Sequence, residues 1–513
     1  MSAAAIPVTA AAADTPWRPL KALLGGIVDV PDQFQVADLT LDSRSVRPGA
    51  AFLACRGRTR HGLDFAPAAV AAGACAVLWE PAPGVSAPQF SAPVLVVAVP
   101  ELSAQAGFIA DRFFGAPSAR LLVVGVTGTN GKTTCAWLLA AALSASGRSC
   151  AYLGTLGAGL AGQVVPGTHT TPDAVTLQRQ LRQLRDAGAA AVALEVSSHA
   201  LDQQRCAGVR FQIAAFTNLS RDHLDYHGDM RAYAAAKAAL FDWPTLSAQV
   251  INVDDDFGAQ LATRSSPGAA LVVTGRQGDP AQRVPGARFV HAVRCTHQTR
   301  GLEIGLATSW GEATLRSALL GDFNLDNLLT VLGVLLASGM ELQAACGVLA
   351  GCSAPPGRMQ LAGGAGLPLA IVDYAHTPDA LDHALRAARA HCEGKLLCVF
   401  GCGGDRDRGK RAQMGRVAES LAEVLYITDD NPRSEDPQRI VDDIVAGLRE
   451  PAHAQVLHDR ALAITAALAA AAPGDVVLVA GKGHEDYQLV GAERRPFSDL
   501  AQVHAALAAR SAA

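Results

Sequence analysis

The 513-residue chain lacks three features that would quickly place it in a class of protein. It has no excess of basic residues, since 43 Lys and Arg against 47 Asp and Glu leave a formal net charge of −4. This balance disfavours a general nucleic-acid or membrane-surface binder. No uninterrupted apolar run reaches the ~18 residues of a transmembrane helix, and residues 1–14 lack the basic and apolar segments of a signal peptide. We therefore expect a cytoplasmic protein with a flexible, alanine-rich N-terminal lead-in.

Paired cysteines are also missing. The chain has 11 cysteines, an odd number, and none of them forms a CxxC pair. Cys398 and Cys402 come closest, but no second pair accompanies them, so a zinc site is not predicted. We expect small, buried thiols in a reducing compartment.

Apolar residues, in contrast, are plentiful: half of the chain is hydrophobic and 18% is charged. A chain of this length predicts about three domains. Proline- and glycine-bearing stretches at residues 115–118 and 353–357 are typical of linkers. They predict domains over residues 1–118, 119–354 and 355–513.

Short apolar runs alternate with amphipathic stretches in the second and third of these domains, which predicts α/β domains with mainly parallel sheets. The predicted strands cover residues 121–124, 191–194, 213–216 and 250–253, and then 369–372, 396–400, 424–427 and 476–479. Polar clusters follow nearly every one of these strands. Because ligands gather at the carboxyl ends of parallel strands, two sheets with such clusters predict a site between domains.

The sharpest motif is a glycine-rich segment at residues 125–134, between a predicted strand and a predicted helix. Glycines let backbone N–H groups wrap phosphates, and the helix N-terminus adds a partial positive charge. Lys132 is placed to reach the β- and γ-phosphates and Thr133 to bind Mg²⁺. The general phosphate-loop pattern fails at one place, where Val126 occupies the position of its first glycine.

Several other motifs are ambiguous when taken singly. Glu195 ends a predicted buried strand, where an acidic magnesium ligand is common, but a helix-cap acid is an equal alternative. His223 is either a metal ligand or a hydrogen-bonded loop histidine. Residues 430–433 and 481–485 are each explained by a simple turn.

Together, five motifs in this order resemble the Mur ligase family: residues 128–134, 195–199, 218–228, 430–433 and 481–485. With residues 41–44, the resemblance runs from Leu41 to Glu485 and is strongest to the diaminopimelate-adding branch of the family. The departure at Val126 is also how the family's own loop looks. The resemblance implies an N-terminal UDP-substrate-binding domain, a central P-loop ATPase with a parallel sheet, and a C-terminal, Rossmann-like, amino-acid-binding domain.

Site residues follow from the same resemblance. For the UDP-substrate it implies Leu41, Ser43, Arg58, Thr59, Arg60, His169, Thr170, Thr171, Ser197, Gln203 and Arg205. For ATP it implies Gly128, Thr129, Asn130, Gly131, Lys132, Thr133, Thr134, Asn327, Arg358 and Asp373, with His376 nearby. For diaminopimelate it implies Arg406, Asp430, Asn431, Pro432, Arg433, Gly481 and Glu485.

The resemblance also implies a catalytic group made of Lys132, Glu195, His223 and Lys237. Thr133, Glu195, His223 and Lys237 are the implied metal-site residues, with Lys237 carried as N6-carboxylysine. From the sequence alone, Lys237 is simply a surface lysine on a helix. Arg433 and Arg406 are the cations expected to select the second carboxylate of diaminopimelate.

The implied reaction is the ATP-dependent addition of meso-2,6-diaminopimelate to UDP-N-acetylmuramoyl-L-alanyl-D-glutamate, through an acyl phosphate, in cytoplasmic peptidoglycan precursor synthesis. It needs ATP as co-substrate and Mg²⁺, and its partners are small molecules. We expect a monomer without nucleic acid or membrane insertion. Two alternatives stay open at this point: a folylpolyglutamate synthase, and a nucleotide-switched regulatory protein that makes no amide product.

Overall fold

The computed structural model describes residues 17–511 except 92, 168, 265–267 and 365, so the predicted lead-in at residues 1–14 lies outside the described residues. The chain divides into two compact units. The first comprises Met1–Phe289 with Gly333–Met340, and the second Val290–Leu332 with Glu341–Ala513. No helix within the described part of the chain is long and apolar enough to cross a membrane. The division into domains at residues 118 and 354 stays a prediction.

A four-stranded parallel sheet opens the first unit. Its order is β3 (Asp38–Thr40), β4 (Ala50–Ala54), β5 (Ala76–Trp79) and β6 (Leu95–Ala98). Helix α2 (Ala66–Ala71) packs its small residues against Phe52 and Trp79. Helix α3 (Leu102–Phe114) supplies large apolar side chains to a second core cluster with the same sheet.

The second sheet of the first unit has the order β13-β12-β11-β7-β10-β8-β9, parallel except for β9. Its strands are β7 (Leu122–Thr127), β8 (Cys150–Gly154), β9 (Gly157–Leu160), β10 (Ala191–Glu195), β11 (Ile213–Phe216), β12 (Ala248–Asn252) and β13 (Ala270–Gly275). The predicted parallel α/β sheet is therefore confirmed. Its central strand β7 is followed by helix α4 (Lys132–Ala145), which places the glycine-rich segment at the carboxyl end of the sheet.

Helix α3 joins the two sheets of the first unit by packing against helix α5 (Ala174–Asp186). A side chain at Gly107, in the middle of α3, would bring its Cβ within 2.2 Å of the Ala207 carbonyl oxygen. Glycine is therefore required for the helix to approach this loop. Two ion pairs also cross between the sheets: Arg210 with Asp111 at 3.1 Å and Arg179 with Asp38 at 2.8 Å.

The second unit begins with an antiparallel meander that the sequence analysis did not predict. It consists of β14 (Arg288–Gln298), β15 (Gly301–Thr308) and β16 (Gly311–Ser317). Two helices follow: α11 (Asp322–Ala337), whose residues from Gly333 onward belong to the first unit, and α12 (Leu342–Ala350). The strands are long and their burial alternates, as in β15. One face of such a strand is polar, so it does not form the continuous apolar run that indicates a buried strand in the sequence.

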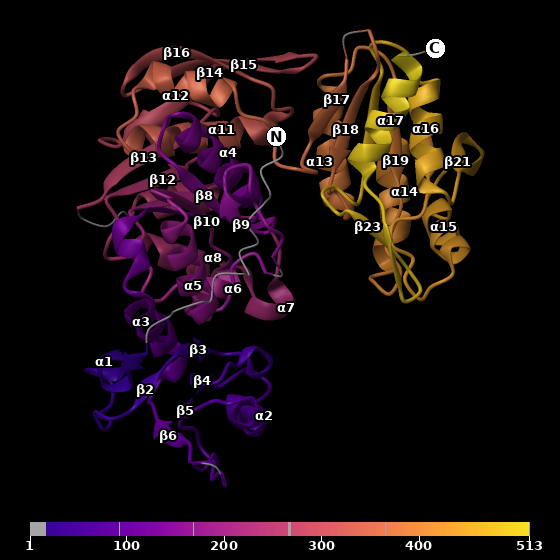
Figure 1. The fold of residues 1–513 in the computed structure, drawn as a ribbon. Helices are drawn as coiled ribbons and strands as arrows, with labels where there is room; N and C mark the ends of the chain where they lie inside the picture. Colours follow the sequence, from indigo (N-terminus) through magenta and orange to yellow (C-terminus); the bar gives the residue numbers. More distant parts are fainter. Residues whose placement is uncertain (1–16, 92, 168, 265–267, 365, 512–513) are drawn as a thin grey trace. The chain divides into compact units, whose positions relative to one another are not determined.

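A six-stranded sheet completes the second unit, with helices on both faces (Figure 1). Its order is β17 (Gln360–Gly363), β18 (Leu369–Asp373), β22 (Val476–Ala480), β19 (Leu396–Phe400), β20 (Val424–Ile427) and β21 (Ala454–Val456). Helices α13 (Pro378–Arg389), α14 (Gly409–Leu421) and α15 (Pro437–Val445) share one core cluster; α16 (Arg460–Ala470) and α17 (Asp499–Ser511) share the other. Only β17 is antiparallel to its neighbour, so the predicted parallel sheet is confirmed here too.

Candidate active site

The glycine-rich segment forms a tight loop between β7 and α4. Gly128 has φ +149°, and a Cβ there would lie 1.9 Å from Thr217 Oγ1. The loop is held from β11, because the Thr129 N–H donates to the Asn218 carbonyl at 2.8 Å and the Asn130 N–H donates to Asn218 Oδ1 at 3.0 Å. The strand, loop and helix predicted for phosphate binding are thus present, and they leave the N-terminus of α4 facing the loop.

Two lysines converge on this loop. Lys132 Nζ donates to the carbonyls of Gly128 and Thr129 at 2.9 and 2.8 Å, and Lys237 Nζ donates to the same Gly128 carbonyl at 2.7 Å. Lys237, on α8 (Met230–Ala238), is only 1% exposed, so the reading of Lys237 as a surface lysine is wrong. Burial, reinforced by the positive charge of Lys132, lowers the pKa of Lys237 to about 6.

Glu195 is the acidic group beside the loop. Its carboxylate is fully buried and accepts hydrogen bonds from Thr133 Oγ1 at 2.9 Å, from the Thr155 N–H at 2.9 Å and from the Tyr152 hydroxyl. A Cβ at Gly154 would lie 2.2 Å from Glu195 Oε1, so the end of β8 closely covers the carboxylate. Sequence reasoning missed Tyr152 and Thr155. Tyr152 lies in the middle of β8 and Thr155 directly follows this strand, which neighbours the strand of Glu195 only in the folded chain.

Of the four implied metal-site residues, the structure brings Thr133 and Glu195 into direct contact. His223 lies apart: it has φ +53°, its side chain is about half exposed, and its ring stands 4.8 Å from that of His199. Within the described residues, no hydrogen bond or ion pair joins His223 to Thr133 or Glu195. Nor does a group of three or more His, Cys, Asp or Glu there form a ready cation site.

Residues implied for the UDP-substrate form a chain of hydrogen bonds that starts at Glu195. Thr171 Oγ1 donates to the Glu195 carbonyl at 2.8 Å and accepts from the Ser197 N–H at 3.1 Å. The Arg205 guanidinium donates to the Thr171 carbonyl at 2.9 Å and to Gln203 Oε1 at 2.6 Å. Another implied residue, Thr170, contacts the side chain of Thr155 at 3.0 Å, so the same network reaches the end of β8.

The N-terminal sheet adds a cavity of about 500 Å³ within the first unit. The residues that line it include Thr40, Asp42, Arg44, His169, Asp173 and Arg179. The implied residues Leu41 and Ser43 lie between three of these lining residues in the sequence. The sequence analysis missed Arg179, whose only signal was a basic residue on an amphipathic helix. Arg58 points to another part of the unit, with its guanidinium carbon 4.2 Å from the centre of the Tyr226 ring. Arg60 instead lies over Phe65.

The implied ATP-binding residues of the second unit are held in different ways. The Asp373 carboxylate accepts hydrogen bonds from the N–H groups of Met359 and Ala375, and burial raises its pKa. The guanidinium carbon of Arg358 lies 4.9 Å from the centre of the Tyr374 ring. Asn327 is buried in α11, where its amide donates to Asn324 Oδ1 at 3.1 Å.

At the carboxyl ends of β20 and β22, the implied diaminopimelate residues surround a lysine that the sequence analysis did not select. Lys482 Nζ is fully buried and donates to Asn431 Oδ1 and Glu485 Oε2, both at 3.1 Å. The Asn431 amide also donates to Glu485 Oε2 at 2.9 Å. Burial raises the pKa of Asp430, whose Oδ2 would lie 2.5 Å from a Cβ at Gly481. Lys482 stands in a glycine-rich segment, which the sequence analysis explained as a turn.

Arg433 extends the same rim. Its backbone has φ +52° and pairs with the β23 segment (Tyr487–Val490), since its N–H donates to the Leu489 carbonyl at 3.0 Å. One guanidinium nitrogen, Nη1, donates to the Gly404 carbonyl at 2.6 Å. Gly404 is held closely in turn, because a Cβ there would lie 1.9 Å from the Pro432 carbonyl oxygen. Arg406, the second expected cation, is exposed.

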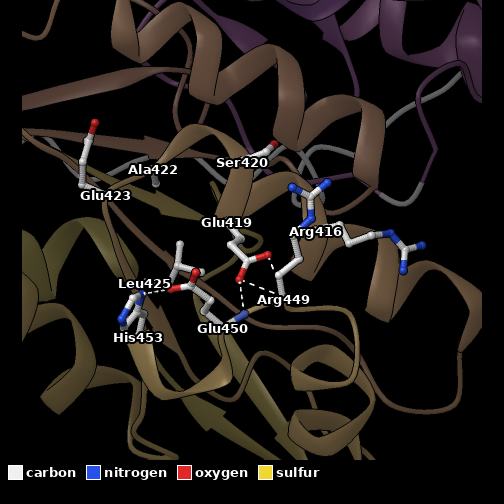
Figure 2. Close-up of a pocket in the computed structure, with 9 residues that line it drawn as sticks. All are labelled: Arg416, Glu419, Ser420, Ala422, Glu423, Leu425, Arg449, Glu450 and His453. Carbon is white, nitrogen blue, oxygen red and sulfur yellow. Dashed lines mark hydrogen bonds and ion pairs between the residues drawn. The ribbon is translucent and has the colours of Figure 1, made fainter.

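A cavity of about 330 Å³ lies elsewhere in the second unit (Figure 2). It is lined by Arg416, Glu419, Ser420, Ala422, Glu423, Leu425, Arg449, Glu450 and His453. Glu419 is satisfied by the N–H groups of Arg449 and Glu450, and Glu450 pairs with His453 at 2.9 Å. None of the implied site residues is in this cavity, which lies near the amino end of β20 rather than at the rim that carries Asp430.

Comparison with known proteins separates the remaining interpretations. Three family descriptions match in sequence order: "Mur ligase family, catalytic domain" at residues 35–111, "Mur ligase middle domain" at 126–335 and "Mur ligase, glutamate ligase domain" at 357–483. The chain is 51% identical over 478 residues to the UDP-N-acetylmuramoyl-L-alanyl-D-glutamate–2,6-diaminopimelate ligase of Ectopseudomonas mendocina, which covers 93% of this chain and 96% of that protein. The chain belongs to the Mur ligase family.

Solved structures agree with the Mur ligase assignment. A structure of a UDP-N-acetylmuramoyl-L-alanyl-D-glutamate–2,6-diaminopimelate ligase, 35% identical, matches with a TM-score of 0.73 over 97% of this chain and all of that one. The α/β fold expected of the family, with its three-domain architecture, is thereby confirmed. A folylpolyglutamate synthase of Mycobacterium tuberculosis matches with a TM-score of 0.55 at 17% identity over 72% of this chain, which shows a shared fold only.

Proposed function

We propose that this Mur ligase adds meso-2,6-diaminopimelate to UDP-N-acetylmuramoyl-L-alanyl-D-glutamate, with hydrolysis of ATP to ADP and phosphate. The observation that carries the proposal is the 51% identity, along nearly the whole of both chains, to a ligase named for this reaction. The reaction would serve peptidoglycan precursor synthesis in the cytoplasm, with small molecules as partners and the monomer as the working form.

The loop of residues 128–134 would bind the ATP phosphates. Its backbone N–H groups and the N-terminus of α4 supply positive potential, and Lys132 is close enough to move from its two loop carbonyls to a phosphate oxygen. In the second unit, Asn327, Arg358 and Asp373 would meet the rest of the nucleotide. Phosphoryl transfer needs little covalent help from the protein, so these groups act by positioning and by offsetting charge.

Thr133 and Glu195 suit Mg²⁺, because a hydroxyl and a carboxylate oxygen 2.9 Å apart are the hard donors that this ion prefers. Glu195 and Thr133 would also leave further coordination positions of the ion for phosphate oxygens and water. His223 would join as a further ligand. When bound, the ion would offset the negative charge that gathers between ATP and the substrate carboxylate.

Lys237 would act as a carbamate. With its pKa lowered to about 6, its amine is largely neutral at physiological pH, and a neutral amine is the form that attacks CO₂. The new N–C bond yields R–NH–COO⁻, and the amine proton goes to solvent. The product replaces a buried amine beside Lys132 with an anion, which would pair with that lysine and support the metal site.

The reaction would proceed in two steps. The γ-phosphoryl group of ATP passes to the D-glutamyl carboxylate, which gives an acyl phosphate and ADP. The amine of diaminopimelate then attacks the acyl carbon, the C–N bond forms, the C–O bond to phosphate breaks, and the amine loses its proton. Thr170, Thr171, Ser197, Gln203 and Arg205 form one polar surface that would hold the muramoyl-peptide part of the substrate. The cavity beside residues 41–44 would take the uridine diphosphate, with His169 in its lining.

The rim of the second unit would bind diaminopimelate. Asn431, Glu485 and Gly481 would receive one amino-acid head group, with Asp430 and Pro432 shaping the turn. Among the described residues, the Arg433 guanidinium donates to protein through Nη1, so its other N–H groups can grip the distal carboxylate, with Arg406 as a second cation.

Mass spectrometry of the products tests the proposal directly. Purified protein is incubated with ATP, Mg²⁺ and diaminopimelate, and with either the UDP-muramoyl dipeptide or a folate as acceptor. A UDP-muramoyl tripeptide containing diaminopimelate is the expected product. A glutamylated folate would instead assign a folylpolyglutamate synthase, and a nucleotide-dependent conformational change without amide product would assign a regulatory protein.

A further inference from the structure

Tyr226 lies between two parts of the first unit that the proposed function uses separately. The residue belongs to the short helix α7 (Leu224–His227), which follows His223 directly. On one side, the guanidinium of Arg58 lies over the ring at 4.2 Å. On the other, the ring of His199 lies 4.1 Å from that of Tyr226. Arg58 is 168 positions away in the sequence, so the fold alone creates this contact.

The hydroxyl of Tyr226 is held by two hydrogen bonds. It donates to Asp202 Oδ2 at 2.7 Å and accepts from Gln203 Nε2 at 2.8 Å. Gln203 in turn accepts from Arg205, so the hydroxyl is joined to the polar surface proposed for the muramoyl peptide. The orientation of the ring is therefore set by two hydrogen bonds from the segment after β10.

From His199 the ring contacts continue toward the phosphate loop. His199 meets His223 edge-on at 4.8 Å and His227 at 5.4 Å, and His227 lies 5.2 Å from Tyr233. The Tyr233 hydroxyl contacts Thr129 Oγ1 in the phosphate loop at 3.2 Å. Lys237 Nζ lies 4.4 Å from the centre of the same Tyr233 ring. A continuous set of aromatic side chains thus runs from the N-terminal loop of Arg58 to the ATP side of the site.

We propose that Tyr226 is a positioning residue for the ligation reaction: its ring holds Arg58 for the UDP-substrate and, through His199, holds His223 beside the phosphate loop. The proposal rests on the proposed function, because Arg58 and His223 take their roles from it. One side chain would then position both the cation that binds the substrate, Arg58, and the proposed metal ligand, His223. His223 is exposed, and within the described chain its only ion-pair partner is its neighbour Asp222, at 3.5 Å. The orientation of its ring therefore depends on packing against other rings.

Three substitutions separate the ring from the hydroxyl. Tyr226→Leu removes the ring, Tyr226→Phe keeps the ring and removes both hydrogen bonds of the hydroxyl, and Arg58→Ala removes the stacked cation. Phe108→Leu is the matched control, since Phe108 is an exposed ring on α3 away from these contacts. Thermal unfolding of each variant shows whether it folds.

The first measurement is the Kd of the UDP-muramoyl dipeptide, determined by calorimetry without ATP or metal. A cation–π contact at an exposed site is worth ~0.5–1 kcal/mol, or about 2- to 5-fold in Kd. We expect Tyr226→Leu to weaken binding by this factor at least and Tyr226→Phe to weaken it less. In the double variant Tyr226→Leu/Arg58→Ala, the first change has already removed the stacked pair. The effects of the two changes on Kd should therefore be non-additive.

The second measurement is Mn²⁺ bound in the presence of ADP, with the free ion followed by electron paramagnetic resonance. Tyr226→Leu should weaken Mn²⁺ binding, whereas Arg58→Ala and Phe108→Leu should not. Additive effects on Kd, or wild-type Mn²⁺ binding by folded Tyr226→Leu, would overturn the positioning role. Failure of the wild-type protein to make the tripeptide would instead overturn the proposed function, and with it this inference.

Discussion

Two buried lysines, one in each unit, show how the surroundings of a side chain decide what it can do. Lys237 and Lys482 are both at most 1% exposed, and both lie at the carboxyl end of a parallel sheet. Lys482 contacts Glu485 at 3.1 Å and lies 3.9 Å from Asp430, so acidic groups balance its charge. Lys237 donates to a neutral carbonyl, and burial, reinforced by the positive charge of Lys132, lowers its pKa to about 6.

The difference teaches that burial alone does not make a reactive amine. A buried ammonium with carboxylate partners makes a structural contact, because its charge and theirs balance one another. A buried amine facing another cation is favoured in the neutral form. Lys237 is therefore suited to carbamate chemistry, whereas Lys482 is suited to holding the rim of the amino-acid site.

The largest expected effect comes from the cation beside Lys237. Lys132→Ala should lower kcat by ~10³-fold or more, as with other groups that stabilise a transferring phosphoryl group. Binding of the UDP-muramoyl dipeptide should change little, since its proposed cavity lies beside residues 41–44. Steady-state kinetics and calorimetry measure the two effects. Near-normal turnover in this variant would contradict the assignment of the ATP site.

Next comes a direct comparison of the two lysines by chemical rescue. Lys237→Ala should be almost inactive and should regain part of its activity with an added short carboxylate, which replaces the carbamate anion. Lys482→Ala is the matched control and should not respond, because its site lost a cation. A neutral additive of similar size should rescue neither variant. Equal rescue by the neutral additive would indicate cavity filling and remove the argument for a carbamate.

The carbamate should also depend on pH in a defined direction. Because the pKa of Lys237 is lowered to about 6, its amine is protonated below that pH and neutral above it. We expect the ¹³C nuclear magnetic resonance signal of a carbamate, formed with ¹³CO₂, to weaken as the pH falls through about 6. The signal should be missing in Lys237→Ala and present in Lys482→Ala. A signal that persists unchanged at pH 5 would be inconsistent with a neutral-amine origin.

A smaller kinetic effect is expected at the rim around Lys482. Arg433→Ala should raise the KM for diaminopimelate about 10- to 100-fold, since a hydrogen bond to a charged group contributes ~1.5–3 kcal/mol. The KM for ATP should hardly change. Wild-type protein should prefer diaminopimelate over L-lysine by up to ~10⁴-fold, because lysine would leave the cation unpaired. Equal ligation of both amino acids would refute this choice of substrate while leaving the ligase reaction standing.

The last expected effects are on stability rather than on activity, and they should have opposite signs. Unfolded lysine keeps its proton up to pH ~10.4, whereas Lys237 in the folded protein loses it near pH 6. Between these values the unfolded state binds more protons, so wild-type stability should rise with pH. Lys237→Met should remove this dependence and stabilise the protein at pH 7 by on the order of a few kcal/mol.

Lys482→Met should destabilise the protein, because it leaves buried Asn431 and partly buried Glu485 without their cation. Thermal unfolding of both variants at pH 7 and pH 9 measures these shifts. The same sign for both variants would show that the two environments are not electrostatically different.

The sequence by itself determined the features that depend on a few consecutive residues. The phosphate loop follows from a strand, a glycine-rich turn and a helix within residues 122–145, and each of these is favoured locally. The eight predicted strands of the two parallel sheets are continuous apolar runs, buried on both faces, and all of them are present. Ordered motifs along the chain were also sufficient to indicate the family.

Only the tertiary structure decided the features that join distant segments. Lys237 occurs in an alanine-rich helix whose pattern does not mark its buried side, and its pKa is lowered by burial and further by Lys132, which lies 105 positions earlier. The Tyr152 hydroxyl reaches Glu195 because β8 and β10 are neighbours, and Arg58 reaches Tyr226 because α3 and α5 pack the two sheets of the first unit together. Local preferences act over a few residues, whereas burial and charge act through space; the spatial neighbours of a residue therefore decide its chemistry.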